Sequence, residues 1–238
     1  MDTTPDPDPA AGPDDPFTPD GAARDEPTQF VLPLVVRIER DEPPTRTDAL
    51  ETAARAVLTL LADPRANGDG EWAQRVRDWQ DARIRKVVRR ARGGEWRKAE
   101  ALPGITVHGD HAEVRVYPPV PLDGWPPQLA KLQVSGTDLD DPAELVKPLP
   151  GLPMLWLNPG LPMTAGKAMA QVGHAAQLAW WDLTEAERER WAEADFPLAV
   201  RTATPEHWKV LLDAGLPTVR DAGFTEVTPG STTAIAEL

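Results

Sequence analysis

The sequence predicts an α/β protein made of two similar three-layer α/β/α domains. Two observations carry this prediction. Segments with strand and helix patterns alternate along the chain, as is typical of α/β folds, and the same order of segments occurs before residue 118 and again after residue 150. The length of 238 residues is enough for one large domain or two small ones.

In the first half, an apolar run at 30–38 indicates a buried strand, and an Ala- and Leu-rich stretch at 47–63 indicates a helix. Two short apolar segments around Gly109-Asp110 are typical of a hairpin. The full predicted order is strand 30–38, helices 47–63 and 71–82, strand 85–91, helix 93–101, and strands 105–107 and 112–117.

The second half repeats this order. Its predicted strands are 154–158, 198–202, 218–221 and 232–236, and its predicted helices are 164–181, 185–194 and 205–214. Pro205 at the start of the last helix and Gly215 just after it fit the usual preferences of helix ends.

Individual residues also recur between the halves. Four residues match without a gap: Val88, Arg89, Ala91 and Trp96 correspond to Val200, Arg201, Ala203 and Trp208. Leu102-Pro103 corresponds to Leu216-Pro217, and Glu113-Val114 to Glu226-Val227. Chance matching of common residues is the alternative, but the ungapped match favours an internal duplication.

Composition separates these halves from a tail and a connector. Residues 1–28 are rich in Pro and acidic side chains and are predicted to be a disordered tail. The first domain is expected at 29–121, a Pro-rich connector at 122–150 and the second domain at 151–238.

The net charge of −13 is unevenly distributed. Residues 1–27 carry eight acidic side chains and one Arg, whereas ten basic residues lie between Arg75 and Lys98. A local basic patch can bind phosphates in an acidic protein, so Arg89 and Arg90 are candidate substrate ligands; a solvated surface is the alternative. The tail is expected either to compete weakly with RNA for this patch or to act only in solubility.

Several classes of function are excluded or disfavoured. The chain has no Cys, which excludes disulfides and thiol catalysis. No apolar run is long enough to span a membrane, and the N-terminus lacks a signal-peptide pattern. We therefore expect a cytoplasmic protein, and the Arg-, Ala- and Pro-rich composition is typical of a GC-rich bacterial genome.

The predicted helix 164–181 carries the first candidate functional residues. Lys167, Gln171 and His174 fall on one narrow stripe, and the apolar residues of the helix lie on the opposite side, which packs on a sheet. Lys167 falls in the first turn, where the helix dipole disfavours a cation. A role in holding an anion with the free N–H groups would explain that position; an ordinary solvated helix face is the alternative.

Two further segments could complete a site. Asp221-Ala-Gly-Phe-Thr225 would place a carboxylate and a hydroxyl on one turn. The segment 229–233, which ends at Thr233, is a hydroxyl-rich loop that an ordinary hairpin would also explain.

Together these segments resemble the type 2 peptidyl-tRNA hydrolases over about residues 152–236. The matching motifs are Gly-Lys-x-x-x-Gln-x-x-His-Ala from Gly166, Gly-Leu-Pro from Gly215, and Asp-Ala-Gly-x-Thr-Glu-Val-x-Pro-Gly-Ser-x-Thr from Asp221. The resemblance implies a four-stranded mixed sheet with helices on both faces in each half. It also implies hydrolysis of the ester between a peptide and tRNA, without metal or cofactor.

The resemblance assigns Lys167, Asp221 and Thr225 to catalysis and Gln171, His174 and Thr233 to substrate binding. Family members are usually homodimers, so two fused halves imply an intrachain pseudo-dimer that is a monomer in solution. The chain departs from the family at Asn158-Pro159-Gly160, where an Arg-x-Asp is usual, and at Thr164-Ala165, where basic residues are usual. These departures put tRNA affinity in doubt.

The first half lacks the candidate residues. By the local offsets, its counterparts of Lys167, Gln171, His174, Asp221 and Thr225 are Leu50, Ala54, Val57, His108 and Ala112. His108 and His111 are interpreted as a loop pair, with a metal site as the alternative. Two other functions stay open: a non-catalytic RNA- or protein-binding module, and an esterase or amidase on another substrate.

Overall fold

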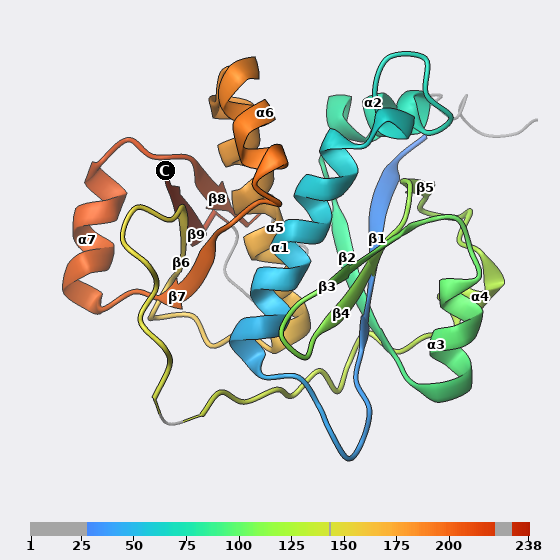
Figure 1. The fold of residues 1–238 in the computed structure, drawn as a ribbon, viewed down its shortest axis with the longest axis horizontal. Helices are drawn as coiled ribbons and strands as arrows, with labels where there is room; N and C mark the ends of the chain where they lie inside the picture. Colours follow the sequence, from blue (N-terminus) through green and yellow to red (C-terminus); the bar gives the residue numbers. More distant parts are fainter. Residues whose placement is uncertain (1–27, 143, 222–229) are drawn as a thin grey trace, which may run out of the picture.

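A computed structural model describes residues 28–142, 144–221 and 230–238 of the chain. It confirms the α/β class, with two mixed sheets flanked by helices (Figure 1). The predicted acidic tail and its competition with RNA fall on residues outside the described ranges, so both stay predictions.

The first half follows the predicted order closely. Its strands are β1 (Phe30–Arg37), β2 (Lys86–Ala91), β3 (Ile105–His108), β4 (Glu113–Val116) and β5 (Val120–Pro121). Its helices are α1 (Arg46–Ala62), α2 (Ala73–Asp81), α3 (Gly93–Glu100) and α4 (Pro127–Ala130), with a short 3₁₀ turn at Pro64–Ala66.

The second half repeats this order. Its strands are β6 (Met154–Leu157), β7 (Ala199–Thr202), β8 (Thr218–Arg220) and β9 (Thr232–Glu237). Its helices are α5 (Ala165–Asp182), α6 (Glu185–Glu193) and α7 (Pro205–Asp213).

The two sheets share one topology. The strand order is β2-β1-β4-β3 in the first sheet and β7-β6-β9-β8 in the second. In each sheet the first pair is parallel and the other two are antiparallel. The first sheet departs from the expected four strands because β5 also pairs with the start of β1. Repetition of order, direction and register supports the internal duplication.

The strand register corrects the residue matches at the end of each half. Val114 pairs with Val36 in the first sheet, and Ala234 pairs with Leu157 in the second. The counterpart of β4 is therefore β9, so the match of Glu113-Val114 with Glu226-Val227 is wrong. The mistake arose because four residues join β3 to β4, whereas eleven join β8 to β9, and sequence offsets alone did not locate that difference.

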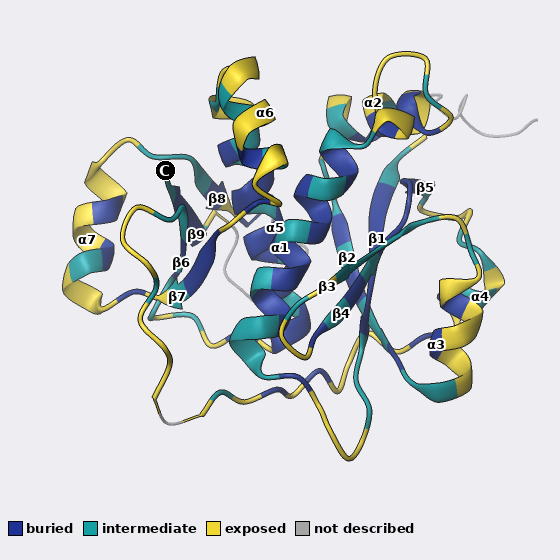
Figure 2. Cartoon of the chain, in the orientation of Figure 1, coloured by how far each residue is buried: buried dark blue, intermediate teal, exposed yellow. Residues whose placement is uncertain are grey.

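Helices α1 and α5 form a layer between the two sheets. Helix α5 contacts α1, β2 and β9, and α1 contacts β4 and β7 (Figure 1). Residues of both halves consequently share one apolar core. Helices α3 and α4 cover the outer face of the first sheet, and α7 covers that of the second. Figure 2 shows the buried central helices and the exposed outer faces of α3 and α7.

The connector caps both central helices. Thr137 accepts hydrogen bonds from the first turn of α5, through its carbonyl from Ala165 N at 3.2 Å and through its hydroxyl from Gly166 N at 2.9 Å. Asp141 accepts from the backbone N–H and the hydroxyl of Thr47 in α1, at 2.7 and 2.8 Å. The segment between the halves therefore fixes the ends of the two helices on which the site depends.

Within the described ranges, no helix combines the length and the apolar character needed to cross a membrane.

Candidate active site

A cavity of about 830 Å³ lies where the two halves meet. One wall is formed by α5 and the end of β8, and the opposite wall by the start of β2 and residues 134–136 of the connector. Four of the candidate residues line it: Lys167, Gln171, His174 and Asp221.

The predicted stripe on α5 is confirmed in its spacing but not in its direction. The prediction that it faces away from the sheet is wrong, because α5 packs between two sheets and the stripe lies at a cavity bounded by strands of both. Gln171 is 5% exposed, and its Oε1 accepts a 2.6 Å hydrogen bond from the buried hydroxyl of Thr233 in β9. Thr233 thus holds Gln171 at the edge of the cavity.

Lys167 presents a buried amine at the start of α5. Its Nζ atom is shielded from solvent and has no hydrogen-bond partner among the described residues. A desolvated ammonium without a partner is costly, and its place in the first helical turn adds an unfavourable dipole interaction. Such a group is poised to bind a carbonyl oxygen or an anion in the cavity.

Two of the backbone N–H groups at the start of α5, which were expected from the sequence to be free for an anion, are already engaged. Thr164 occupies the N-cap position without a side-chain capping bond, and Thr137 takes the N–H groups of Ala165 and Gly166 instead. A Cβ at residue 166 would lie 2.7 Å from the Thr137 hydroxyl. Glycine in the Gly-Lys motif therefore permits this close contact.

Asp221 stands at the end of β8 and is 7% exposed. Its backbone N–H donates to Ser231 O at 2.9 Å, and its carbonyl accepts from Gly230 N at 2.8 Å, so the residues just after β8 and just before β9 are hydrogen-bonded to each other. Lys167 and Asp221 thus approach one cavity from different elements. Thr225 falls in segment 222–229, outside the described residues, so its assignment stays a prediction.

His174 contacts a lysine from the other half. Lys86 Nζ lies 3.1 Å from His174 Nδ1 and 2.5 Å from Gln177 Oε1. Burial and the charge of Lys86 lower the pKa of His174 well below its usual value, and burial lowers the pKa of Lys86. His174 is therefore a neutral group near pH 7, unsuited to binding a phosphate as a cation.

Arg89 and Arg90 lie outside the cavity lining and hold the connector in place. Arg89 Nη1 donates to the carbonyls of Ala130 and Leu132 at 2.9 and 2.6 Å, and its guanidinium lies 4.4 Å from the Trp125 ring. Arg90 donates to Ser135 O and to Gln133. These contacts favour a structural role over the expected substrate binding.

The basic run does not form a single patch. Arg75 and Arg77 lie on α2, which precedes β2, and Arg97 and Lys98 lie on α3, which follows it (Figure 1). The two helices therefore sit at opposite ends of one strand.

The corresponding position in the first half is occupied by its own side chains. Thr45 and Thr164 are the N-caps of α1 and α5. When the two helices are aligned on these caps, the residue equivalent to Lys167 is Asp48, not Leu50. The Asp48 carboxylate accepts from the N–H groups of Asp110, His111 and Ala112, at 2.7 to 3.0 Å. A short hairpin closed over an aspartate leaves no equivalent site.

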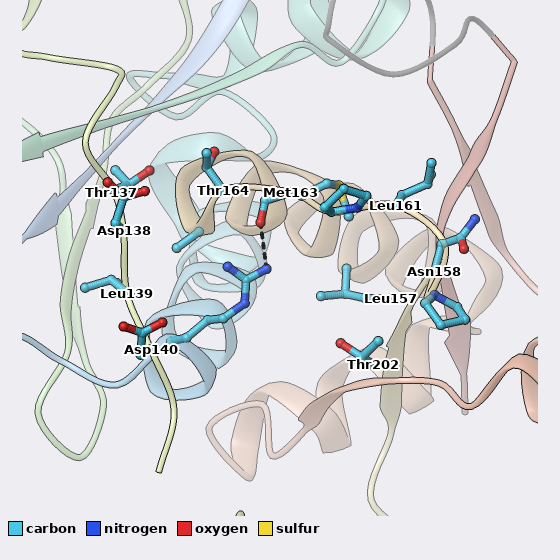
Figure 3. Close-up of a pocket in the computed structure, with 14 residues that line it drawn as sticks. Thr137, Asp138, Leu139, Asp140, Leu157, Asn158, Leu161, Met163, Thr164 and Thr202 are labelled. Carbon is cyan, nitrogen blue, oxygen red and sulfur yellow. Dashed lines mark hydrogen bonds between the residues drawn. The ribbon is translucent and has the colours of Figure 1, made fainter. Parts of the chain in front are cut away.

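A second cavity, of about 580 Å³, is lined by residues at the N-terminus of α5, by residues 137–140 of the connector and by the end of β6 (Figure 3). Arg46 crosses it to donate to Met163 O at 3.0 Å. Asn158 donates to Thr232 O and accepts from Gly160 N, both at 2.8 Å. Asn158 therefore stabilises the end of β6, and Lys167 and Asp221 are absent from this lining.

Comparison with known families supports the sequence resemblance. Residues 154–237 match the family model of peptidyl-tRNA hydrolase PTH2. The matched segment contains β6 to β9 and α5, so the predicted resemblance is confirmed for the C-terminal part of the chain. Neither the curated proteins nor the solved structures gave a match.

Sequence reasoning missed three residues around the cavity between the halves: Lys86, Thr137 and Gln177. Gln177 lies within the motif helix, three residues after His174, and that spacing was a usable signal. Lys86 and Thr137 carry no local signal, because their contacts cross from another half or from the connector.

Proposed function

We propose that this chain hydrolyses the ester that links an N-acylated amino acid or peptide to the 3′ end of tRNA. The observation that carries the proposal is the buried amine of Lys167, which has no hydrogen-bond partner among the described residues and lies in the same cavity as Asp221. The match of residues 154–237 to peptidyl-tRNA hydrolase PTH2 supports it. Because tRNA is the substrate, we expect the reaction to take place in the cytoplasm.

The proposed chemistry needs no group beyond side chains and water. The Asp221 carboxylate orients a water and takes its proton as the water oxygen attacks the ester carbonyl. Lys167 stabilises the negative charge that develops on the carbonyl oxygen. The bond to the ribose 3′ oxygen then breaks, and that oxygen takes the proton back from Asp221. By the family resemblance, Thr225 positions the water or the carbonyl.

Gln171 and His174 are proposed to orient the substrate. Gln171 is fixed by Thr233, and His174 by Lys86, so both present side chains with a set direction to the cavity. Fixed groups of this kind lose little entropy when the substrate binds.

The test is release of N-acetylated amino acid from N-acetylaminoacyl-tRNA. We expect turnover by the full chain and a fall in kcat/KM of about 10²- to 10³-fold in Lys167→Ala. Lys209→Ala, which removes an exposed lysine from α7, is the matched control and should match the wild type. Equal rates for Lys167→Ala and the control would exclude this site. Tight binding of tRNA without turnover would favour the non-catalytic alternative.

A further inference from the structure

Lys86 is a buried cation that the proposed chemistry does not use. It lies at the first residue of β2, in the half without the motif, and is 8% exposed. Its Nζ has three hydrogen-bonding neighbours: Gln177 Oε1 at 2.5 Å, His174 Nδ1 at 3.1 Å and Ile84 O at 3.3 Å. The Trp79 ring lies 4.8 Å away. Among the described residues, Lys86 has no carboxylate in salt-bridge range.

The chemistry of these neighbours determines which group donates. An ammonium carries three hydrogens and accepts none, and a carbonyl oxygen accepts only. With Lys86 as an ammonium, all three neighbours are satisfied only if His174 Nδ1 accepts a hydrogen bond, whereas a neutral amine would itself accept from Nδ1–H. In a neutral imidazole, the proton then resides on Nε2 at the other side of the ring.

We infer that Lys86 is a positioning residue, supplied by the motif-less half, that acts as an ammonium and holds His174 as the neutral Nε2–H tautomer. In that form His174 is a hydrogen-bond donor toward an oxygen of the substrate in the cavity. This role rests on the proposed function, and it places both halves in one active site. It also separates His174 from the general base, since its acceptor nitrogen is already engaged.

Two further observations support this arrangement. Desolvation and the nearby Lys86 charge both lower the pKa of His174, so the ring stays neutral. Gly173, next to His174 in the motif, lets the Lys86 stem pass: a Cβ there would lie 3.3 Å from Lys86 Cδ and 3.1 Å from Val57 Cγ2. A side chain at 173 would therefore require Val57 and the Lys86 stem to shift by a few tenths of an ångström.

The direct test is ¹⁵N NMR of histidine side chains in the full chain. The wild-type signal that disappears in His174→Gln should show the Nε2–H tautomer and stay neutral at about pH 6 to 8. Lys86→Met should shift it toward Nδ1–H, while Lys98→Met, which removes an exposed lysine from α3, should leave it unchanged. A wild-type Nδ1–H or imidazolium signal would overturn the inference, as would a tautomer that Lys86→Met leaves unaltered.

Kinetics provide the second arm. Loss of one hydrogen bond predicts a fall in kcat/KM of about tenfold for Lys86→Met. Adding Lys86→Met to His174→Gln should have no further effect, because the lysine acts through the histidine. Fully additive losses would overturn the positioning role. Thermal unfolding confirms that each variant is folded.

The two arms separate this inference from the proposed function. If even the wild type fails to hydrolyse N-acetylaminoacyl-tRNA, the proposed substrate is wrong, while the NMR result still decides the Lys86–His174 contact. If the wild type is active and Lys86→Met matches Lys98→Met in both arms, the inference fails and the proposed function stands.

Discussion

Lys86 should leave a signature in the pH dependence of stability. Burial lowers its pKa well below that of an exposed lysine, so the unfolded chain binds more protons than the folded chain between the two pKa values. The free energy of unfolding therefore rises with pH through that window, and the full penalty is present below the folded pKa. We expect Lys86→Met to flatten this rise.

Urea unfolding at pH values from about 7 to 9.5 tests this prediction. The curve of free energy against pH should be flatter for Lys86→Met than for the wild type, by about 1 kcal/mol or more over the range. Lys98→Met should run parallel to the wild type. Parallel curves for all three proteins would show that folding does not lower the pKa of Lys86.

The buried hydrogen bond between Thr233 and Gln171 gives a second prediction at this scale. Thr233→Val keeps the shape of the side chain but leaves Gln171 Oε1 without its 2.6 Å donor. We expect a loss of about 1–3 kcal/mol in the free energy of unfolding. The neighbouring Thr232→Val, on a half-buried residue at the start of β9, should cost no more than about 0.5 kcal/mol. Equal losses would assign the effect to the strand and not to the bond.

The sequence predicted individual residues where their partners are local. The spacing of Lys167, Gln171 and His174 predicted a common stripe, and all three line one cavity. The packing around that stripe was not predictable from helical periodicity, because α1 and β2, which contact α5, belong to the other half. The contact of Lys86 with His174 was not predictable either, because the two residues are 88 positions apart in the sequence.

At the scale of elements, the connector is an active part of the fold. Asp141 holds the N-terminus of α1 through two hydrogen bonds to Thr47. We expect Asp141→Ala to cost about 1–2 kcal/mol, as losses of helix caps do. The exposed Asp138→Ala in the same segment is the matched control and should stay within about 0.5 kcal/mol of the wild type. Urea unfolding measures both, and indistinguishable variants would contradict the capping role.

Long elements with a clear apolar pattern were predictable, and short ones in the Pro-rich stretch were not. The predicted range 164–181 differs from α5 by one residue at each end. Strand β5 has two residues and α4 has four, too few for a periodic pattern, and tertiary pairing with β1 defines β5. The alignment of the halves failed at residues 109–112, because this four-residue connection corresponds to eleven residues between β8 and β9.

At the scale of the whole molecule, the shared layer of α1 and α5 couples the halves. Their apolar residues belong to one core, and Glu51 of α1 accepts hydrogen bonds from Val200 N and Arg201 Nη1 in the second half, at 3.0 and 2.9 Å. We expect the full chain to unfold in one transition by circular dichroism and by tryptophan fluorescence. Separate transitions for the two halves would contradict this coupling.

The same layer predicts how each half behaves alone. A fragment of residues 151–238 would expose the face of α5 that α1 covers, so we expect it to self-associate or to lack a cooperative transition. The full chain, in which that face is used internally, is expected to be a monomer by light scattering. A monomeric, cooperatively folded fragment would show that the halves are independent.

The central claim is that the ester is cleaved in the cavity between the halves. A crystal structure with an RNA hairpin ending in a 3′-amide-linked N-acetylamino acid, which cannot be hydrolysed as an ester, tests it most directly. We expect the amide carbonyl about 3 Å from Lys167 Nζ, with the terminal ribose between α5 and the start of β2. A ligand in the cavity of Figure 3, or only on the outer helices, would contradict the account.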